Sequence, residues 1–100
     1  MRVITIGRLR EFWEQAARSD AEQPLRAWHK EAEKADWTCW ADIKAQFGSA
    51  DSPGNDRVVF NIGGNKYRLI VKVDYRHKKV FIRWVGTHKA YDELEDVTQL

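Results

Sequence analysis

The chain has 100 residues, 43% apolar and 32% charged, a composition that predicts one soluble globular domain over residues 1–100 and argues against a disordered segment. No apolar run approaches the roughly 20 residues that cross a bilayer, and the start, MRVITIGRLREFW, lacks the features of a secretory signal, so we expect a cytoplasmic protein. Cys39 is the only cysteine, which excludes an internal disulfide and a cysteine-based zinc site.

Charge is distributed unevenly along the chain. The formal net charge is +2, but residues 58–91 carry eight basic side chains and only one acidic side chain, Asp74. Residues 1–57 are nearly neutral, and residues 92–100 contain four acids. Charge of one sign concentrated in one part of a fold is typical of a surface that binds a polyanion, so we expect a nucleic-acid partner. The alternative is an ordinary solvated surface.

The first half of the chain is predicted to be a short strand followed by helices. The strand covers residues 3–6 and is expected to join a sheet formed by the second half. Residues 8–47 are predicted to be helical because apolar side chains recur three or four residues apart. Ser19 and Glu22 match a capping box and Pro24 suits a first turn, which predicts the start of a second helix there. The apolar stripes are Leu9, Phe12, Trp13 and Ala16, then Leu25, Trp28, Ala32 and Ala35, then Trp40, Ile43 and Phe47, with Gly48 closing the third helix.

Four tryptophans, Trp13, Trp28, Trp37 and Trp40, lie in or beside this helical segment. They could form a surface that binds another protein. Aromatic side chains at helical spacing more often fill a core, so we predict that these four pack inside the domain.

From residue 58 the apolar residues alternate, which indicates β-strands. The preceding segment, residues 48–57 (GSADSPGNDR), is rich in turn formers and is predicted to be a loop. Residues 58–85 are predicted to form a meander of three antiparallel strands. Together with the helices, these elements predict an α+β fold with two to three N-terminal helices packed on one face of the sheet.

The alternation also predicts the register of the meander. If Val73 pairs with Val80, the apolar residues of the two strands share one face, and Arg83 lies opposite Ile70. On the third strand, the face toward the helices would then carry Val80, Ile82 and Trp84, and Asn61 would lie opposite Arg68 on the other face. That second face gathers polar side chains, which are Asn61, Lys66, Arg68, Lys72 and Arg83.

The third strand runs into the sequence VGTHKAYD. Thr87 suits the N-cap of a short helix over about residues 87–95, in which His88 and Tyr91 share a face at the end of the strand. A lone histidine is more often a surface or capping residue, but the neighbouring Lys89, Tyr91 and basic face favour a functional role for His88.

The other two histidines, His29 and His77, have no such neighbours and are expected to be solvated. No cluster of acidic residues accompanies any histidine, so we expect no metal site and no cofactor.

The run VVFNIGGNKYRLIVKVDYRHKKVFIRWVGTHKAYDEL resembles the HigB family of toxins from bacterial toxin–antitoxin modules, within the broader RelE-like group. The similarity extends to REFWEQ, PLRAWHKEAEKADW and ADIKAQF, and so to nearly the whole chain. The resemblance implies a RelE-like fold with a strongly curved sheet, and a metal-independent endoribonuclease that cuts messenger RNA on the ribosome. It also implies inhibition by an adjacent helix-turn-helix antitoxin, similar to HigA.

The resemblance also implies roles for single residues. Arg68, in YRL, matches an arginine that contacts the scissile phosphate in RelE-like toxins. His88 stands where several relatives have an arginine, and Tyr91 matches only loosely the tyrosine that some relatives use near their C-terminus. These departures leave open which group is the general base and which the general acid.

RNA carries its own nucleophile, the 2′-OH, so the protein must align the phosphate, stabilise its charge and move protons. We expect Arg68 and Arg83 to bind the phosphate, His88 to transfer protons, and Lys66 to assist electrostatically or share the proton transfer. Tyr91 would contact a base. Further RNA contacts are expected from Asn61, Lys72 and Lys89. The alternatives are a non-catalytic RNA- or ribosome-binding module that uses the same face, and a protein-interaction domain that uses its tryptophans.

Overall fold

A five-stranded sheet organises the fold in the computed structural model, which describes residues 1–100. The strand order is β1-β5-β4-β3-β2, with β1 parallel to β5 and every other pair antiparallel. The strands are β1 (Arg2–Ile4), β2 (Asp51–Gly54), β3 (Arg57–Ile62), β4 (Tyr67–Asp74) and β5 (Lys79–Thr87). The α-helices are α1 (Gly7–Trp13), α2 (Glu22–Lys34), α3 (Trp40–Gln46) and α4 (His88–Asp92), with 3-10 turns η1 (Ala16–Ala21) and η2 (Val97–Gln99). The predicted α+β class is confirmed.

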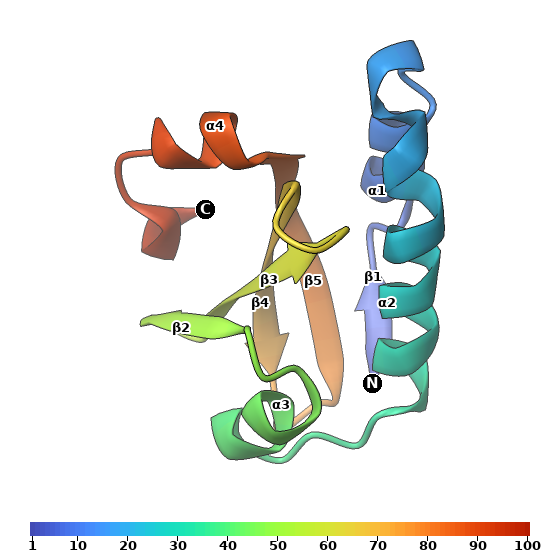
Figure 1. Cartoon of the computed structure of the whole chain (residues 1–100). Helices are drawn as coiled ribbons and strands as arrows, with labels where there is room; N and C mark the ends of the chain where they lie inside the picture. Colours follow the sequence, from blue (N-terminus) through green and yellow to red (C-terminus); the bar gives the residue numbers. More distant parts are fainter.

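The helices cover one face of the sheet and leave much of the other open. Helices α1 and α2 run along the side of β1 and β5, α3 lies at one end of the sheet and α4 at the other (Figure 1). Trp13, Trp28 and Trp37 are buried in the core, and Trp40 packs against it, as their helical spacing predicted. No helix combines the length and the apolar character that a membrane span requires.

The predicted start of the second helix is wrong in one detail. Ser19 does not cap a helix, because residues 16–21 already form the 3-10 turn η1, which runs directly into α2 at Glu22. The main-chain N–H of Glu22 donates to the carbonyl of Ser19, so no side-chain cap is needed there. Ala16, placed on the first apolar stripe, is exposed as a result.

The prediction that residues 48–57 form a loop is wrong in part. Residues Asp51–Gly54 form β2, an edge strand on β3, where Pro53 is tolerated because an edge need not donate every hydrogen bond. Asn55 and Asp56 join β2 to β3 with φ angles of 54° and 59°. Two consecutive residues with positive φ form the turn that matches the twist of a hairpin, and Asn and Asp tolerate that conformation.

The register of the meander follows the prediction over most of its length and departs from it once. Val73 pairs with Val80 and Asn61 with Arg68, as expected. The expected pairing of Arg83 with Ile70 is wrong: Trp84 lies opposite Ile70. A β-bulge inserts Arg83 as an extra residue between the pairs formed by Ile82 and Trp84.

The bulge exchanges the faces of the residues that follow it. Trp84, predicted to face the helices, shares the open face with Ile70, and Val85 lies opposite Leu69 and packs against the core. Trp84 lies so close across Gly86 that a Cβ on Gly86 would come within 2.4 Å of the indole ring. The indole thus covers a strand glycine on the open face.

This contact predicts the effect of Gly86→Ala. The added methyl group has to displace the indole of Trp84, which also neighbours the ring of Tyr91, with centroids 6.3 Å apart. We expect a loss of about 1–3 kcal/mol in the free energy of unfolding, measured by urea denaturation. Gly48→Ala is the control, because a Cβ there meets no atom within 4 Å. Equal stability of the two variants would contradict the assigned position of Trp84.

Candidate functional site

The open face is the side of β3, β4 and β5 that α1 and α2 do not cover. Strand register arranges its side chains in three rows across the sheet. We call them the Arg68 row (Asn61, Arg68, Gly86), the Ile70 row (Val59, Ile70, Trp84) and the Lys72 row (Arg57, Lys72, Phe81). Val59 and Ile70 are buried but lie outside the main core, which is consistent with their place on this face.

A hollow of about 290 Å³ lies at the Arg68 row. The Arg68 guanidinium carbon is 5.7 Å from the centroid of the Tyr91 ring, and Arg68 forms no salt bridge. Its one hydrogen bond, from Nη1 to the carbonyl of Asn65, is long at 3.5 Å. The guanidinium therefore keeps its capacity to bind a phosphate. The hollow is lined by Lys44, Ser49, Ala50, Asp51, Val59, Asn61, Arg68 and Tyr91.

Two lining residues bind the main chain of residues 48–50, which forms one side of this hollow. Lys44 donates from Nζ to the carbonyls of Gly48 (2.6 Å) and Ala50 (2.9 Å), and Asn61 donates from Nδ2 to the carbonyl of Ser49 (3.3 Å). Lys44 and Asp51 were not among the predicted site residues. The fold brings them close to β4, and no local sequence pattern around either residue indicates this proximity.

Helix α4 begins at the end of β5, as the Thr87 cap predicted. Thr87 Oγ1 accepts from the main-chain N–H of Ala90 at 3.1 Å. The side chain of His88 is 41% exposed and its Nδ1 lies 3.1 Å from Asp92 Oδ2, which leaves Nε2 free to meet a ligand. Tyr91 lines the Arg68 hollow and His88 does not; the two residues are three positions apart in α4, about one helical turn. Lys89, between them, is exposed.

Lys66 does not direct its ammonium group to the Arg68 hollow. Asp20, in η1, accepts hydrogen bonds from Lys66 Nζ and from the hydroxyl of Tyr67. These bonds lower the pKa of Asp20, that from Lys66 most, and raise the pKa values of Lys66 and Tyr67. The main chain of Lys66 remains next to α4, because its carbonyl accepts from the N–H of His88 at 3.1 Å.

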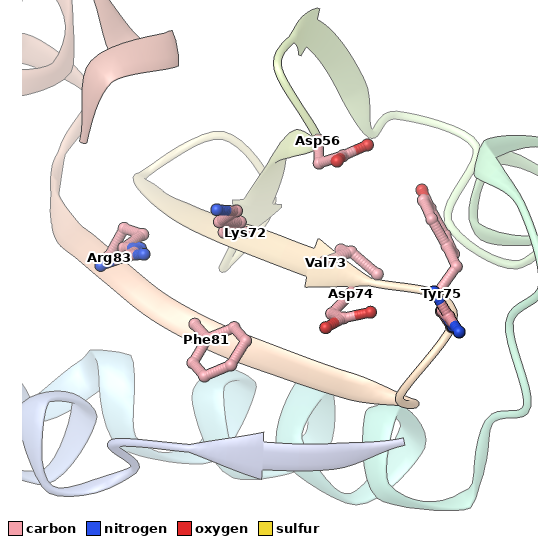
Figure 2. A pocket seen from close by; sticks show the side chains of 8 residues that line it. Asp56, Lys72, Val73, Asp74, Tyr75, Phe81 and Arg83 are labelled. Atoms are coloured by element: carbon pink, nitrogen blue, oxygen red, sulfur yellow. The ribbon is translucent and has the colours of Figure 1, made fainter.

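Lys72 and Arg83 lie in a second, larger hollow of about 570 Å³ with Phe81 (Figure 2). The basic residues expected on one continuous face are thus divided between two hollows, with the Ile70 row between them. His29 pairs with Glu33 within α2, and His77, in the turn after β4, pairs with Asp74 at the end of that strand. No three His, Cys, Asp or Glu side chains are grouped as metal ligands.

Comparison with known proteins shows the family. Residues 21–94 match the HigB toxin family, described as the RelE-like toxic component of a toxin–antitoxin system. The chain belongs to this family, and the matched region contains the whole open face together with His88 and Tyr91.

Individual relatives carry more specific names. The "mRNA interferase toxin HigB" of Escherichia coli (strain K12) is 42% identical over 52 residues, and so is the "mRNA interferase HigB" of Shigella flexneri. Each alignment covers 50% of this chain, and the chain spans about half the length of these relatives.

The contact between Asp20 and Lys66 predicts how stability depends on pH. A carboxyl group whose pKa is lowered in the folded state, here from an ordinary value of 3.8, stabilises the fold above that value. The contribution is lost as the pH falls below 3.8 and through the folded-state pKa. Asp20→Asn should therefore lower the free energy of unfolding at neutral pH. It should also make the fall of that free energy in acid less steep than in the wild type, measured by urea denaturation at successive pH values. Asp36→Asn, which removes an 83% exposed carboxylate, is the control. An unchanged acid profile in Asp20→Asn would contradict this role.

Proposed function

We propose that this protein is the toxin of a type II toxin–antitoxin module and a metal-independent endoribonuclease that cleaves messenger RNA on the ribosome, in the cytoplasm. One observation carries the proposal: Arg68, without an acidic partner, lies beside the Tyr91 ring in a hollow of the open face. Family membership supports it, as do relatives named mRNA interferases.

The proposed chemistry starts from the RNA itself. The 2′-OH attacks the adjacent phosphorus, and the 5′ oxygen of the next nucleotide leaves, which yields a 2′,3′-cyclic phosphate. Negative charge on the phosphate oxygens grows in the transition state. The fork of the Arg68 guanidinium binds two of these oxygens and stabilises that charge.

Proton transfer is assigned to His88. Asp92 holds Nδ1 at 3.1 Å, which orients the ring and leaves Nε2 to exchange a proton with the 2′ or 5′ oxygen. The Tyr91 ring offers a surface on which a base of the same RNA stacks. Asn61 contacts the sugar–phosphate chain within the hollow, and Lys89 adds positive charge near it. The predicted contribution of Lys66 requires its ammonium group to leave Asp20 when RNA binds.

Cleavage by purified variants tests these roles. Arg68→Ala should cut ribosome-bound message about 10²–10³ times more slowly, because a donor to the transition-state charge is lost. His88→Ala should be similarly slow, whereas Lys30→Ala, an exposed change on α2, should cut at the wild-type rate. Near-normal cutting by both Arg68→Ala and His88→Ala would refute the assignment.

A non-catalytic RNA- or ribosome-binding module is the second candidate. Cations without acidic partners serve binding as well as cleavage, and the absence of His88 from the lining of the Arg68 hollow favours this reading. The end groups of RNA recovered from ribosomes decide the matter. The nuclease predicts fragments with 2′,3′-cyclic or 3′-phosphate ends, whereas the binding module predicts intact RNA.

The partner proposed for the silent state is a helix-turn-helix antitoxin similar to HigA. A segment with acidic side chains could cover Arg68, Lys72 and Arg83, which lack acidic partners within the toxin. An antitoxin that clamps the helices and prevents docking on the ribosome is the other mode. Reversing the charge of Arg68 should weaken antitoxin binding in the first mode and leave it unchanged in the second.

A further inference from the structure

The second hollow has the features of a binding site in its own right. It is about twice as large as the Arg68 hollow and is lined by Asp56, Lys72, Val73, Asp74, Tyr75, Arg76, Phe81 and Arg83. Figure 2 shows Lys72 and Arg83 at one side, Phe81 at the floor, and Asp74 and Asp56 at the other side. Two cations, Lys72 and Arg83, thus lie at one end and two carboxylates, Asp56 and Asp74, at the other, and the lining also includes a third cation, Arg76, which follows Tyr75 in the chain.

The cationic end lacks internal partners. Neither Lys72 nor Arg83 forms a salt bridge, and the buried Nε of Arg83 has no hydrogen-bond partner. Arg83 lies over Phe81, with the guanidinium carbon 5.9 Å from the ring centroid. Because Nε is buried, a phosphate in the hollow would bind through the terminal Nη groups of Arg83, which no acidic side chain of the domain pairs with.

The anionic end is fixed by local contacts. Asp74 accepts from the main-chain N–H of His77 at 3.0 Å and pairs with its Nδ1 at 2.8 Å. These bonds lower the pKa of Asp74, so its carboxylate remains charged at neutral pH. The Asp56 side chain makes no hydrogen bond within the chain, although its main-chain carbonyl accepts from Val73. Carboxylates of this kind accept hydrogen bonds from the amino groups of bases.

We propose that this hollow is a second nucleotide subsite, which holds an RNA nucleotide a few residues away from the scissile phosphate. Lys72 and Arg83 bind its phosphate, its base stacks on the surface formed by Phe81 and Arg83, and Asp56 or Asp74 accepts from the base. Adenine, cytosine and guanine carry an amino group that suits these carboxylates. Uracil has no amino group and can donate only through its ring N3–H, so we expect it to bind more weakly. This inference rests on the proposed RNA-cleaving function.

The spacing of the two hollows suits one RNA strand. Lys72 and Arg68 lie four residues apart on the same face of β4, which separates their Cα atoms by about 13 Å. A few nucleotides of single-stranded RNA cover this distance. The Ile70 row lies between the two phosphate positions; Val59 and Ile70 are buried there, and Trp84 is partly exposed.

Binding of oligonucleotides of increasing length tests the proposal. Fully 2′-O-methylated RNA cannot be cut, and the wild type should bind it more tightly once it is long enough to reach both hollows. Phe81→Leu, which keeps the floor apolar but removes the aromatic face, should bind the long oligonucleotide about tenfold more weakly. It should bind the shortest one like the wild type. Lys72→Gln should lower the salt dependence of binding by about one charge, whereas the exposed Lys30→Gln on α2 should not.

Base identity gives an independent readout. Placing uracil in turn at each position of the long oligonucleotide should weaken wild-type binding at one position, and Asp56→Asn should reduce that preference. If Phe81→Leu and Lys72→Gln keep wild-type affinity at every length, the subsite does not exist.

Two other outcomes have different meanings. If the wild type neither binds nor cuts RNA, the proposed function itself fails. If Phe81→Leu loses antitoxin affinity and keeps its affinity for RNA, the hollow is a protein contact and the RNA assignment is overturned.

Discussion

The candidate functional surface depends on one irregularity in the sheet, the bulge that inserts Arg83 into β5 opposite the junction of Ile70 and Val71. Before the bulge Phe81 faces outward, and after it Trp84 and Gly86 do. The bulge exchanges which residues of β5 face outward, so the Trp84 side chain lies at the centre of the open face, with one hollow on either side. The Arg83 side chain joins Lys72 in the larger hollow and does not reach Arg68.

The cations of the sheet differ in whether the chain supplies partners for them. Like charges on neighbouring strands repel by up to about 1 kcal/mol per close pair, so a fold under no functional demand would compensate them. Two cations are indeed compensated: the buried Arg57 donates to main-chain oxygens of Asn55 and Leu100, and Lys66 pairs with Asp20. Arg68, Lys72 and Arg83 are not. Of these cations, those that the chain does not compensate are thus the ones that face the two hollows.

The sequence predicts much of this architecture. The alternation of β4 and β5 sets the pairing of Val73 with Val80, and the spacing of Trp28 in its helix places it in the core. The bulge could not be predicted, because residues 80–85 alternate without a break in the sequence. Nothing in that pattern marks Arg83 as the inserted residue. The contact of Lys66 with Asp20 joins residues 46 positions apart, beyond the reach of any local pattern. Sequence therefore identifies the basic strands, and only the folded chain separates their charges into two hollows.

The central claim is that Arg68 on the open face takes part in cutting messenger RNA in the cell. The most direct measurement maps the 5′ ends of cellular messages shortly after induction of the wild type and of Arg68→Ala at equal protein levels. If Arg68 acts at the scissile phosphate, the wild type produces new ends within translated regions, and these are almost completely lost in the variant. The same set of new ends in both, or none with the wild type, would contradict the claim.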